Sequence, residues 1–534
     1  MKKKMAFVIM FLIITLVACS SGRAFQDAAE PLPLSDQPSM RAQTEEVTRV
    51  VTEIVEVEVE LAAEGEPVEW SAILATQPAQ PAQAVDMFFA DVGENPSVST
   101  ADDNLSTFAI DVDTGAYTLM RSYLTGGVLP PPESVRVEEY INYFDYGYPR
   151  PEDNSFVIHL DGAPAPFAAE ADEYIVRVGI QGFEVPAEER PDMLLIFVVD
   201  TSGSMDGGNR LEQVKASLAM LTEQLRPGDR IGLIEYGSQA RVILEPTDVS
   251  NGEQIFTAIS RLEPNGSTNA EHGLHLGFQM ADTFREGDQP TRLILCSDGV
   301  ANVGNTTAEA ILDYARNGIT LSTFGFGMGN YNDVLMEQLA DQGDGVYAYV
   351  DTPNEAQRLF VDNLTGTLLT IARDAKIQVE FNPDIIASYR LLGYENRAVA
   401  DEDFRNDDVD AGEIGAGHSV TALYAVRPVA EAAADQEALI VRVRYEQPDT
   451  GEVVEIARRI ALRDFAESFA AAPFSLQLAA VVAEYAEQLS QNSQATASGL
   501  DAVLLEAMRV AELFPGDADV QEFIDLLQMA AFRG

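Results

Sequence analysis

Basic side chains are scarce in this sequence. Its 534 residues include 34 lysines and arginines against 86 aspartates and glutamates, which gives a formal net charge of −52. A surface this negative repels nucleic-acid phosphates and anionic lipid headgroups, and it attracts cations and basic partners. The charge therefore excludes a nucleic-acid-binding role. Because solubility or a salty habitat also favours such a composition, the charge limits the class of partner without identifying one.

Long apolar runs are almost absent as well. The exception is residues 6–18, which follow the positively charged segment MKKKM and are too short to span a bilayer comfortably. This order of segments is typical of an export signal. The run ends in Leu16-Val17-Ala18-Cys19, which resembles the lipobox of bacterial lipoproteins. The resemblance implies cleavage before Cys19, lipid attachment to that cysteine, and a place on the extracytoplasmic face of the cell envelope, at an inner or outer membrane that it does not specify.

Cysteine is nearly missing. Besides Cys19 the chain has only Cys296, which lies in the apolar run RLILCSDG, where a free thiol is usually a small buried hydrophobic group. With Cys19 acylated no disulfide can form, so an exported chain of this length must rely on packed cores. The apolar fraction of 46% is sufficient for such cores.

The region after the signal is linker-like. Residues 20–95 are rich in Ala, Glu, Gln, Pro and Ser, and as a coil they would span about 50 Å. Within them, residues 45–64 carry apolar side chains at alternating spacings of three and four. This spacing fits an oligomerising coiled-coil helix, but a stretch of two heptads also fits a disordered segment.

The remaining chain changes its apolar period twice. From residue 192 to about 370, apolar strand-like runs alternate with amphipathic helical patterns, which predicts an α/β fold with a doubly wound, mostly parallel sheet and helices on both faces. Before residue 185 and after residue 375 the period is two, which predicts an antiparallel β unit that flanks the α/β domain or has that domain inserted in it. The pattern after residue 466 is helical.

These changes give the predicted boundaries. The segments are a signal peptide at 1–18, a tether at 19–97, a small N-terminal unit at 98–150, flanking strands at 151–190, the α/β domain at 191–372, the antiparallel β unit at 373–465 and the helical C-terminal segment at 466–534.

Polar side chains lie at the ends of three predicted elements of the α/β domain. Asp200, Ser202 and Ser204 come directly after one strand, Thr268 precedes a helix, and Asp298 follows another strand. In a doubly wound sheet, ligands bind beyond the carboxyl ends of the strands, where these side chains would converge. Carboxylate and hydroxyl oxygens are hard ligands that suit Mg²⁺, Mn²⁺ or Ca²⁺. With few carboxylates, such an ion would keep positive charge and an open position.

The same five residues resemble the metal-ion-dependent adhesion site of von Willebrand factor type A domains. That site has the pattern D-x-S-x-S, a threonine in a G-[GS]-T loop and an aspartate in S/T-D-G, and all its positions match here in order. The segments STFAIDVDTGAY, LPPPESVRVEEYINYFDY and DDVDAGEIGAGHSVTALY look like those of a bacterial YfbK-type family of such domains. The resemblance extends over residues 98–530 and implies an envelope-associated binding protein without naming its ligand.

We therefore expect a lipid-anchored binding protein without covalent chemistry. A divalent cation, Mg²⁺ first with Mn²⁺ and Ca²⁺ as alternatives, would complete its shell with an acidic side chain of a protein partner. One alternative is a hydrolase that uses the ion to activate water, with Glu235 as the base by position only. Another is a structural envelope protein that oligomerises through residues 45–64.

Other motifs carry weaker alternatives. An acid protease needs two D-[TS]-G loops from similar lobes, but Asp113, Asp200 and Asp449 belong to unlike segments. His272 and His275, two of only four histidines, fit either a second metal site or an ordinary helix surface. The acidic stretch at 401–413 fails the EF-hand spacing, which leaves a solvated turn or a weak additional Ca²⁺ site. A P-loop, a nucleophile elbow and a catalytic-cysteine environment are all missing from the sequence.

Overall fold

The computed structural model describes residues 89–151, 155–168, 172–299, 307–312, 318–327, 332–493 and 499–533. The predictions for the signal peptide, for Cys19 and for residues 45–64 lie outside these ranges. Within them, no helix has both the length and the apolar character needed to cross a membrane.

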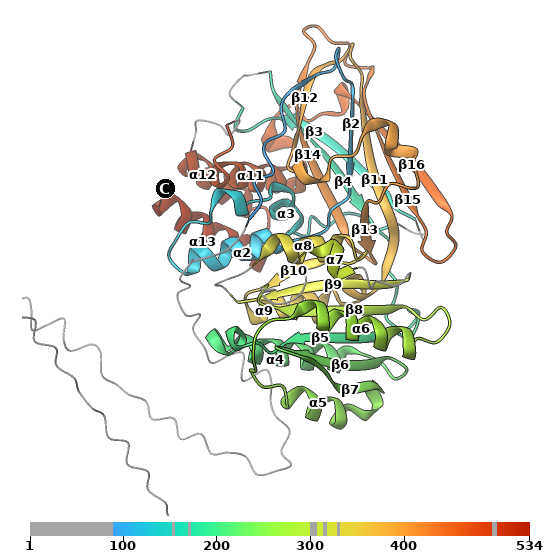
Figure 1. The fold of residues 1–534 in the computed structure, drawn as a ribbon. Coiled ribbons are helices and arrows are strands. Elements are labelled where there is room, and N and C mark those ends of the chain that lie inside the picture. Colours follow the sequence, from blue (N-terminus) through green and yellow to red (C-terminus); the bar gives the residue numbers. More distant parts are fainter. Residues whose placement is uncertain are drawn as a thin grey trace, which may run out of the picture. The chain divides into compact units, whose positions relative to one another are not determined.

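The α/β domain is built on a six-stranded sheet with the order β10-β9-β8-β5-β6-β7 (Figure 1). All neighbouring strands are parallel except β6 and β7, which are antiparallel. The strands are β5 (Leu194–Asp200), β6 (Arg230–Tyr236), β7 (Ala240–Asp248), β8 (Thr291–Ser297), β9 (Ile319–Phe326) and β10 (Tyr347–Val350). Every residue of β5 and β8 is buried, as expected for central parallel strands. The predicted mostly parallel sheet is confirmed.

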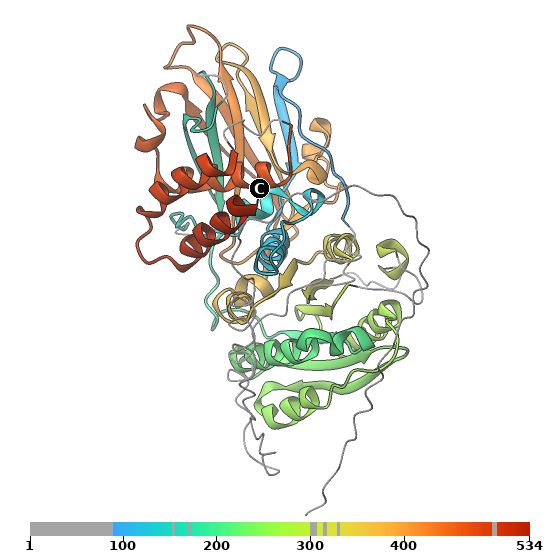
Figure 2. The same ribbon diagram turned by 90° about the vertical axis from the view of Figure 1, so that its left-hand side faces the viewer.

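Helices cover both faces of this sheet (Figures 1 and 2). They are α4 (Arg210–Gln224), α5 (Gly252–Ser260), α6 (Ala270–Phe284), α7 (Ala308–Leu312), α8 (Asp333–Asp341), α9 (Pro353–Gln357) and α10 (Leu364–Leu368). Successive side chains of a strand point to opposite faces. Accordingly, Leu195 and Phe197 of β5 share a core with α4 and α5, whereas Ile196 shares a second core with α6 and α8.

The antiparallel strands form two further sheets that share one core. The first has the order β1 (Val98–Ser99), β12 (Ile386–Leu392), β14 (Ser419–Pro428), β4 (Tyr174–Gln181) and β3 (Val157–Pro164). The second has the order β13 (Gly412–Gly415), β11 (Thr370–Phe381), β15 (Glu437–Glu446) and β16 (Val453–Ala461), and β2 (Leu105–Ala109) pairs with β11. Val178 of β4 and Val379 of β11 belong to the shared core. Because β4 precedes the α/β domain and pairs with β14 after it, the α/β domain is an insertion in this β unit.

A third core joins the two ends of the described chain. It contains α2 (Gly115–Thr125), α3 (Val137–Asn142), α11 (Phe474–Leu489), α12 (Gly499–Ala511) and α13 (Ala518–Arg533). Aromatic rings contact one another in this core, for example Tyr117 with Phe144 at a centroid distance of 5.4 Å and Phe144 with Phe523 at 5.6 Å. The predicted C-terminal helices are therefore confirmed, and they pack on helices from residues 98–150.

Short helical turns lie in several connections. They are η2 (Pro132–Ser134), η3 (Gly203–Asn209), η4 (Val249–Asn251), the π-helical η5 (Arg358–Asp362), η6 (Glu395–Arg397), η7 (Asp401–Arg405), η8 (Leu462–Asp464) and η9 (Phe469–Ala471).

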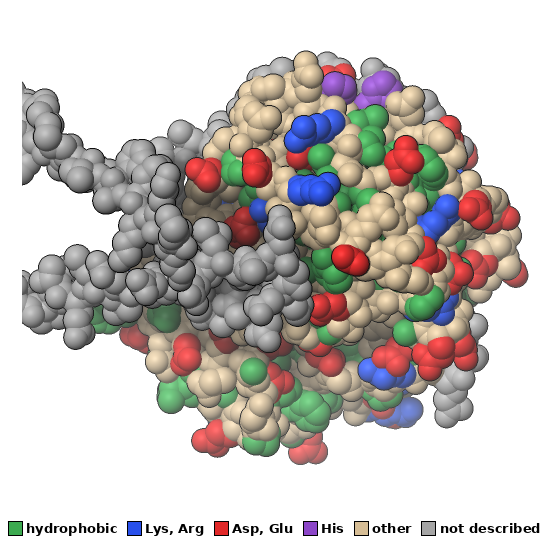
Figure 3. All heavy atoms as spheres, turned by 90° about the horizontal axis from the view of Figure 1, so that it is seen from below, with side chains coloured by type: hydrophobic (Ala, Val, Ile, Leu, Met, Phe, Trp, Pro, Cys, Tyr) green, Lys and Arg blue, Asp and Glu red, His purple; other side chains and the backbone are tan. Residues whose placement is uncertain are grey.

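Figure 3 views the molecule from below Figure 1, the side on which α5 and β7 lie, and shows acidic side chains scattered over this face with basic ones between them.

Candidate metal centre

Asp200 is the last residue of β5 and is fully buried. Its Oδ1 accepts a hydrogen bond from the backbone N–H of Ser202 at 2.8 Å, and its Oδ2 accepts one from the Ser297 hydroxyl at 2.8 Å. The Tyr236 hydroxyl donates a longer hydrogen bond to Oδ2, at 3.4 Å. These donors come from the loop after β5 and from the ends of the neighbouring strands β8 and β6, so the carboxylate is held in one orientation at the carboxyl end of the sheet.

The serine loop, residues 201–204, leads from β5 into η3. The hydroxyl oxygens of Ser202 and Ser204 lie 2.9 Å apart. Ser202 is buried beside Asp200, whereas Ser204 is exposed to solvent. The loop therefore offers two adjacent hydroxyl ligands, one inside the sheet edge and one at the surface.

The threonine loop, residues 264–269, is hydrogen-bonded to the serine loop. The N–H of Gly203 donates to the carbonyl of Gly266 at 3.0 Å, and the N–H of Asn265 donates to the carbonyl of Thr201. Gly266 has φ +84°, and an added Cβ there would lie 2.4 Å from the Ser238 hydroxyl, so only glycine fits. Thr268 follows this turn, and its side chain is buried before α6.

Asp298 lies directly after β8 and is buried. Its Oδ2 accepts a hydrogen bond from the Arg210 guanidinium at 2.9 Å. Burial and the neighbouring Asp298 carboxylate raise the pKa of Asp200 to about 7. The two carboxylates are thus close enough to repel each other, and a cation between them would relieve that repulsion.

The donor set fits a hard divalent cation. The two carboxylates lie at the ends of the paired strands β5 and β8, and the three hydroxyls lie on two loops that are hydrogen-bonded to each other. Oxygen atoms of these types are the ligands of Mg²⁺ and Ca²⁺. The predicted ligands are Asp200, Ser202, Ser204, Thr268 and Asp298. Arg210 is the departure from a purely oxygen-lined site, because its guanidinium already neutralises one oxygen of Asp298.

Three residues near these five escaped the sequence prediction. Ser297 and Tyr236 bind the Asp200 carboxylate, and Arg210 binds Asp298. Ser297 had a usable signal, because it directly precedes Asp298 at a strand end. Tyr236 and Arg210 had none, since their contacts depend on how the strands and α4 are placed in space.

The other predicted candidates do not join this group. Glu235 is buried in β6 and pairs with Arg241. Its neighbour Tyr236 contacts Asp200, and because successive side chains of a strand point to opposite faces, Glu235 points away from that face. His272 and His275 are exposed on α6. Within the described ranges, neither histidine belongs to a group of three or more side chains close enough to share an ion.

The three D-[TS]-G aspartates lie in different surroundings, as predicted. Asp113 is buried, accepts a hydrogen bond from the Tyr347 N–H at 2.9 Å and pairs with Arg397. Asp449 lies exposed in the turn between β15 and β16. Neither is paired with Asp200, so the two-aspartate arrangement of an acid protease is not present among the described residues.

Models of three known protein families match most of the chain. Residues 195–362 match the family described as von Willebrand factor type A domain. Residues 366–532 match the family described as the C-terminal part of uncharacterized protein YfbK, and residues 83–176 match the one described as von Willebrand factor.

Individual relatives cover smaller shares. The chain is 39% identical to uncharacterized protein YfbK of Escherichia coli strain K12 over 343 residues, which are 62% of this chain and 59% of that protein. It is 28% identical to inter-alpha-trypsin inhibitor heavy chain H3 of Homo sapiens over 249 residues, which are 42% of this chain and 27% of that protein. The chain thus spans less than two thirds of the length of either relative.

Among solved structures, a von Willebrand factor type A protein from Catenulispora acidiphila aligns with 72% of this chain and 91% of its own, at a TM-score of 0.43 and 16% identity. The family matches follow one another along the chain and agree with the α/β insertion and the elements after it. The chain is therefore a YfbK-like protein with a von Willebrand factor type A domain and a YfbK C-terminal domain.

Proposed function

We propose that the α/β domain binds a divalent cation through Asp200, Ser202, Ser204, Thr268 and Asp298, and through that ion binds an acidic side chain of a protein partner. Domains of this type typically mediate protein interaction or adhesion. The observation that carries the proposal is the pair of buried carboxylates beside two hydroxyls 2.9 Å apart, where burial and the neighbouring Asp298 raise the pKa of Asp200 to about 7.

The charge of this donor set favours an acidic partner group. Two carboxylates at most balance a divalent ion, and Asp298 already shares its charge with Arg210. An ion held there keeps an affinity for a further negative ligand. The exposed Ser204 lies on the solvent side, where a partner carboxylate would approach. Mg²⁺ is the first candidate, with Mn²⁺ and Ca²⁺ as alternatives.

The proposed setting is the cell envelope. The segment that ends in Leu16-Val17-Ala18-Cys19 supports export and lipid attachment at Cys19, which would anchor the chain on the extracytoplasmic face of a membrane. The anchor and the oligomerisation predicted for residues 45–64 rest on the sequence alone. We propose binding without catalysis, and this is supported by the engagement of Glu235, the one base suggested for a hydrolase, with Arg241.

The test is a calorimetric titration of the full-length chain with Mg²⁺ and Mn²⁺, alongside Asp200→Ala and Thr268→Ala. Both variants should lose the binding heat, since each removes a proposed ligand. Asp282→Ala and Thr283→Ala, which change exposed residues of α6, are the matched controls and should bind as the wild type does. Melting curves identify any variant that fails to fold. Equal metal affinity in all five proteins would disprove the site.

The partner is then sought by cross-linking in Mg²⁺ and in chelator. A partner that binds through the ion should be captured by the wild type only in Mg²⁺ and by Thr268→Ala in neither condition. Capture that is indifferent to both the chelator and Thr268→Ala would contradict the proposed route of binding.

A further inference from the structure

A second group of carboxylates lies between the α/β domain and the β unit. Asp344 comes from the connection between α8 and β10, Asp410 precedes β13, and Glu413 lies within β13. One oxygen of each carboxylate lies within 4.8 Å of the others. We call these three residues the acidic triad. They share no residue with the five predicted ligands of the candidate metal centre.

Glu413 is the residue that separates this group from an ordinary acidic surface. It is only 7% exposed, and no hydrogen bond or ion pair to its side chain is found among the described residues. Its oxygen is nevertheless directed at those of Asp344 and Asp410. A buried carboxylate without a partner is costly, so it requires either a proton or a cation.

The charges around the acidic triad increase this cost. Burial and the carboxylates of Asp344 and Asp410 raise the pKa of Glu413 well above its usual range, and Asp374 and Asp341 act in the same direction. Burial and Asp344 raise the pKa of Asp410 to about 6. The triad is therefore a focus of negative charge.

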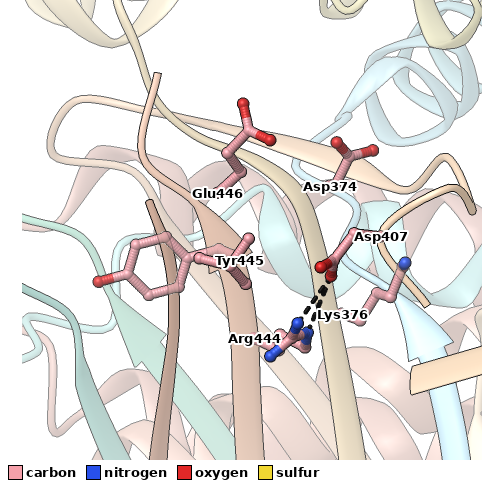
Figure 4. Close-up of a pocket in the computed structure, with 7 residues that line it drawn as sticks. Asp374, Lys376, Asp407, Arg444, Tyr445 and Glu446 are labelled. Carbon is pink, nitrogen blue, oxygen red and sulfur yellow. Dashed lines mark hydrogen bonds and ion pairs between the residues drawn. The ribbon is translucent and has the colours of Figure 1, made fainter. Parts of the chain in front are cut away.

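The nearby arginines do not neutralise the acidic triad directly. Arg292 donates to the hydroxyls of Ser322 and Thr370, at 2.6 and 3.1 Å, and the described residues contain no ion pair between Arg292 or Arg373 and the triad. A neighbouring pocket shows the contrast, because there Arg444 binds the Asp407 carboxylate at 2.7 Å and Lys376 lies beside it (Figure 4). In that pocket a cation is paired directly with its carboxylate, whereas Arg292 and Arg373 act on the triad through space, where they oppose the rise in the pKa of Asp344 that its burial causes.

We propose that the acidic triad is a Ca²⁺ site that fastens the α/β domain to the β unit. Ca–O distances are about 2.4 Å, so oxygens within 4.8 Å of one another can bind one Ca²⁺, whereas Mg²⁺ requires shorter and more regular contacts. A cavity of about 300 Å³, lined by Asp341, Arg397 and Asp410 among others, gives solvent and ions access to the triad at Asp410.

The consequence is a link between two parts of the fold. Asp344 belongs to the insertion, while Glu413 belongs to β13, which pairs with β11 of the β unit. The backbone next to the triad is tightly packed within each part. An added Cβ at Gly412 would lie 1.8 Å from the Ile110 carbonyl oxygen, and one at Gly345 would lie 1.9 Å from the Leu321 carbonyl oxygen. An ion held by both sides would suppress local opening of these segments.

The experiment is a Ca²⁺ titration of the full-length chain by calorimetry, with the variants Glu413→Gln, Asp410→Asn and Thr268→Ala. The triad variants should weaken one Ca²⁺-binding event at least about 10-fold, because even residues that only orient metal ligands contribute that much. Thr268→Ala should retain this event, so that failure here is distinguishable from failure of the candidate metal centre. Asp408→Asn, a change at an exposed neighbour, is the matched control.

A second readout excludes a merely unfolded variant. In chelator, Glu413→Gln should melt no lower than the wild type, because it removes a repelling charge and keeps the shape of the side chain. Ca²⁺ should raise the melting temperature of the wild type and slow hydrogen exchange at residues 343–345 and 412–415, but do neither in Glu413→Gln. Equal Ca²⁺ affinity and equal Ca²⁺ protection in both proteins would show that Glu413 holds a proton instead and would overturn the proposal.

Discussion

The two aspartates at the carboxyl end of the sheet are held by different kinds of partner. Asp200 receives hydrogen bonds from Ser202, Ser297 and Tyr236, which carry no charge. Asp298 receives a full positive charge from Arg210 at 2.9 Å. A cation that binds both carboxylates must therefore approach a guanidinium, and Arg210 should set an upper limit on metal affinity.

Arg210→Gln tests this limit. Removing the guanidinium removes a repulsion of about 1.4 kcal/mol between like charges a few ångströms apart, so Mg²⁺ should bind about 10-fold more tightly. Calorimetry gives the affinity, and Arg241→Gln, at an exposed arginine paired with Glu235, is the control and should change little. Weaker Mg²⁺ binding in Arg210→Gln would mean that Arg210 mainly orients Asp298.

The sequence allowed the five candidate ligands to be chosen because each follows a strand or precedes a helix in a recognisable spacing. Their ligand role stays a prediction. Arg210 and Tyr236 could not be chosen, because they reach the aspartates through the packing of α4 and β6. The sequence indicates only two of the three residues of the acidic triad, Asp410 and Glu413. The stretch 401–413 fits a solvated turn or a weak Ca²⁺ site, but Asp344, which completes the group, comes from a distant element.

At the scale of elements, two turns fit together by backbone contact. The carbonyl of Gly237, just after β6, accepts a hydrogen bond from the Asn269 N–H at 3.1 Å, and the Gly203 N–H reaches the Gly266 carbonyl at 3.0 Å. An added Cβ at Gly237 would lie 2.0 Å from the Asn265 carbonyl oxygen. This contact leaves no room for a side chain, so it fixes the threonine loop against the sheet.

Gly237→Ala should displace that loop. The clash is with backbone and cannot be relieved by a side-chain rotation, so we expect a loss of about 1–3 kcal/mol in the free energy of unfolding and weaker Mg²⁺ binding. Chemical denaturation and calorimetry measure the two effects. Gly207→Ala is the matched control, since an added Cβ there meets nothing within 4 Å. Equal behaviour of the two variants would show that the loop position is not fixed by this contact.

Helices and strands with a strong apolar period can be predicted from the sequence, whereas the elements that they pack against, far along the chain, are harder to predict. The buried strands β5 and β8 are continuous apolar runs, and the alternation of β14 and β15 is visible in the sequence. The packing of α2 and α3 on the C-terminal helices was not predicted. It depends on contacts such as that of the Tyr485 hydroxyl with the Met120 sulfur, at 3.4 Å, between residues far apart in the chain.

At the scale of the whole described unit, a buried arginine connects three regions. Arg121 of α2 binds Asp351, which follows β10, at 2.6 Å and Glu355 of α9 at 2.9 Å. It also binds Glu522 of α13 at 2.7 Å. Asp351 and Glu355 are themselves buried; Glu355 also pairs with Arg358 at 3.2 Å, whereas Arg121 is the one ion-pair partner of Asp351 among the described residues.

Arg121→Met should leave Asp351 buried and uncompensated, and leave Glu355 with Arg358 as its cation. The free energy of unfolding should fall by about 3–5 kcal/mol, the usual cost of breaking a buried ion pair from one side. Denaturant titration provides the measurement. Arg150→Met, which breaks an exposed pair with Glu184, should cost less than about 1 kcal/mol. Comparable losses in the two variants would contradict the role given to Arg121.

Glu138 gives the unit a pH dependence. It is buried in α3 and accepts a hydrogen bond from the Tyr394 N–H at 3.0 Å. Burial, together with Glu395, Asp111 and Glu139, raises its pKa from 4.5 to about 8. Between these values the folded chain keeps a proton that the unfolded chain has released, so the stability contributed by this residue falls as the pH rises through that window.

Glu138→Gln should make this decline shallower by at least about 1 kcal/mol, because glutamine is uncharged at every pH. Thermal or denaturant unfolding across the window measures the slope. Glu133→Gln, at an exposed position in the turn before α3, should leave the slope unchanged. The same slope in wild type and Glu138→Gln would assign the pH dependence to other groups.

The insertion of the α/β domain has a mechanical consequence. Its incoming strand, β4, lies between β3 and β14 in one sheet, and its outgoing strand, β11, lies between β15 and β13 with β2 in the other. A pull exerted on the insertion would divide between two interior strands. Each is held by hydrogen bonds along both edges, so freeing either strand requires two ladders to break. An insertion with this connectivity would transmit tension to the β unit before it unfolded.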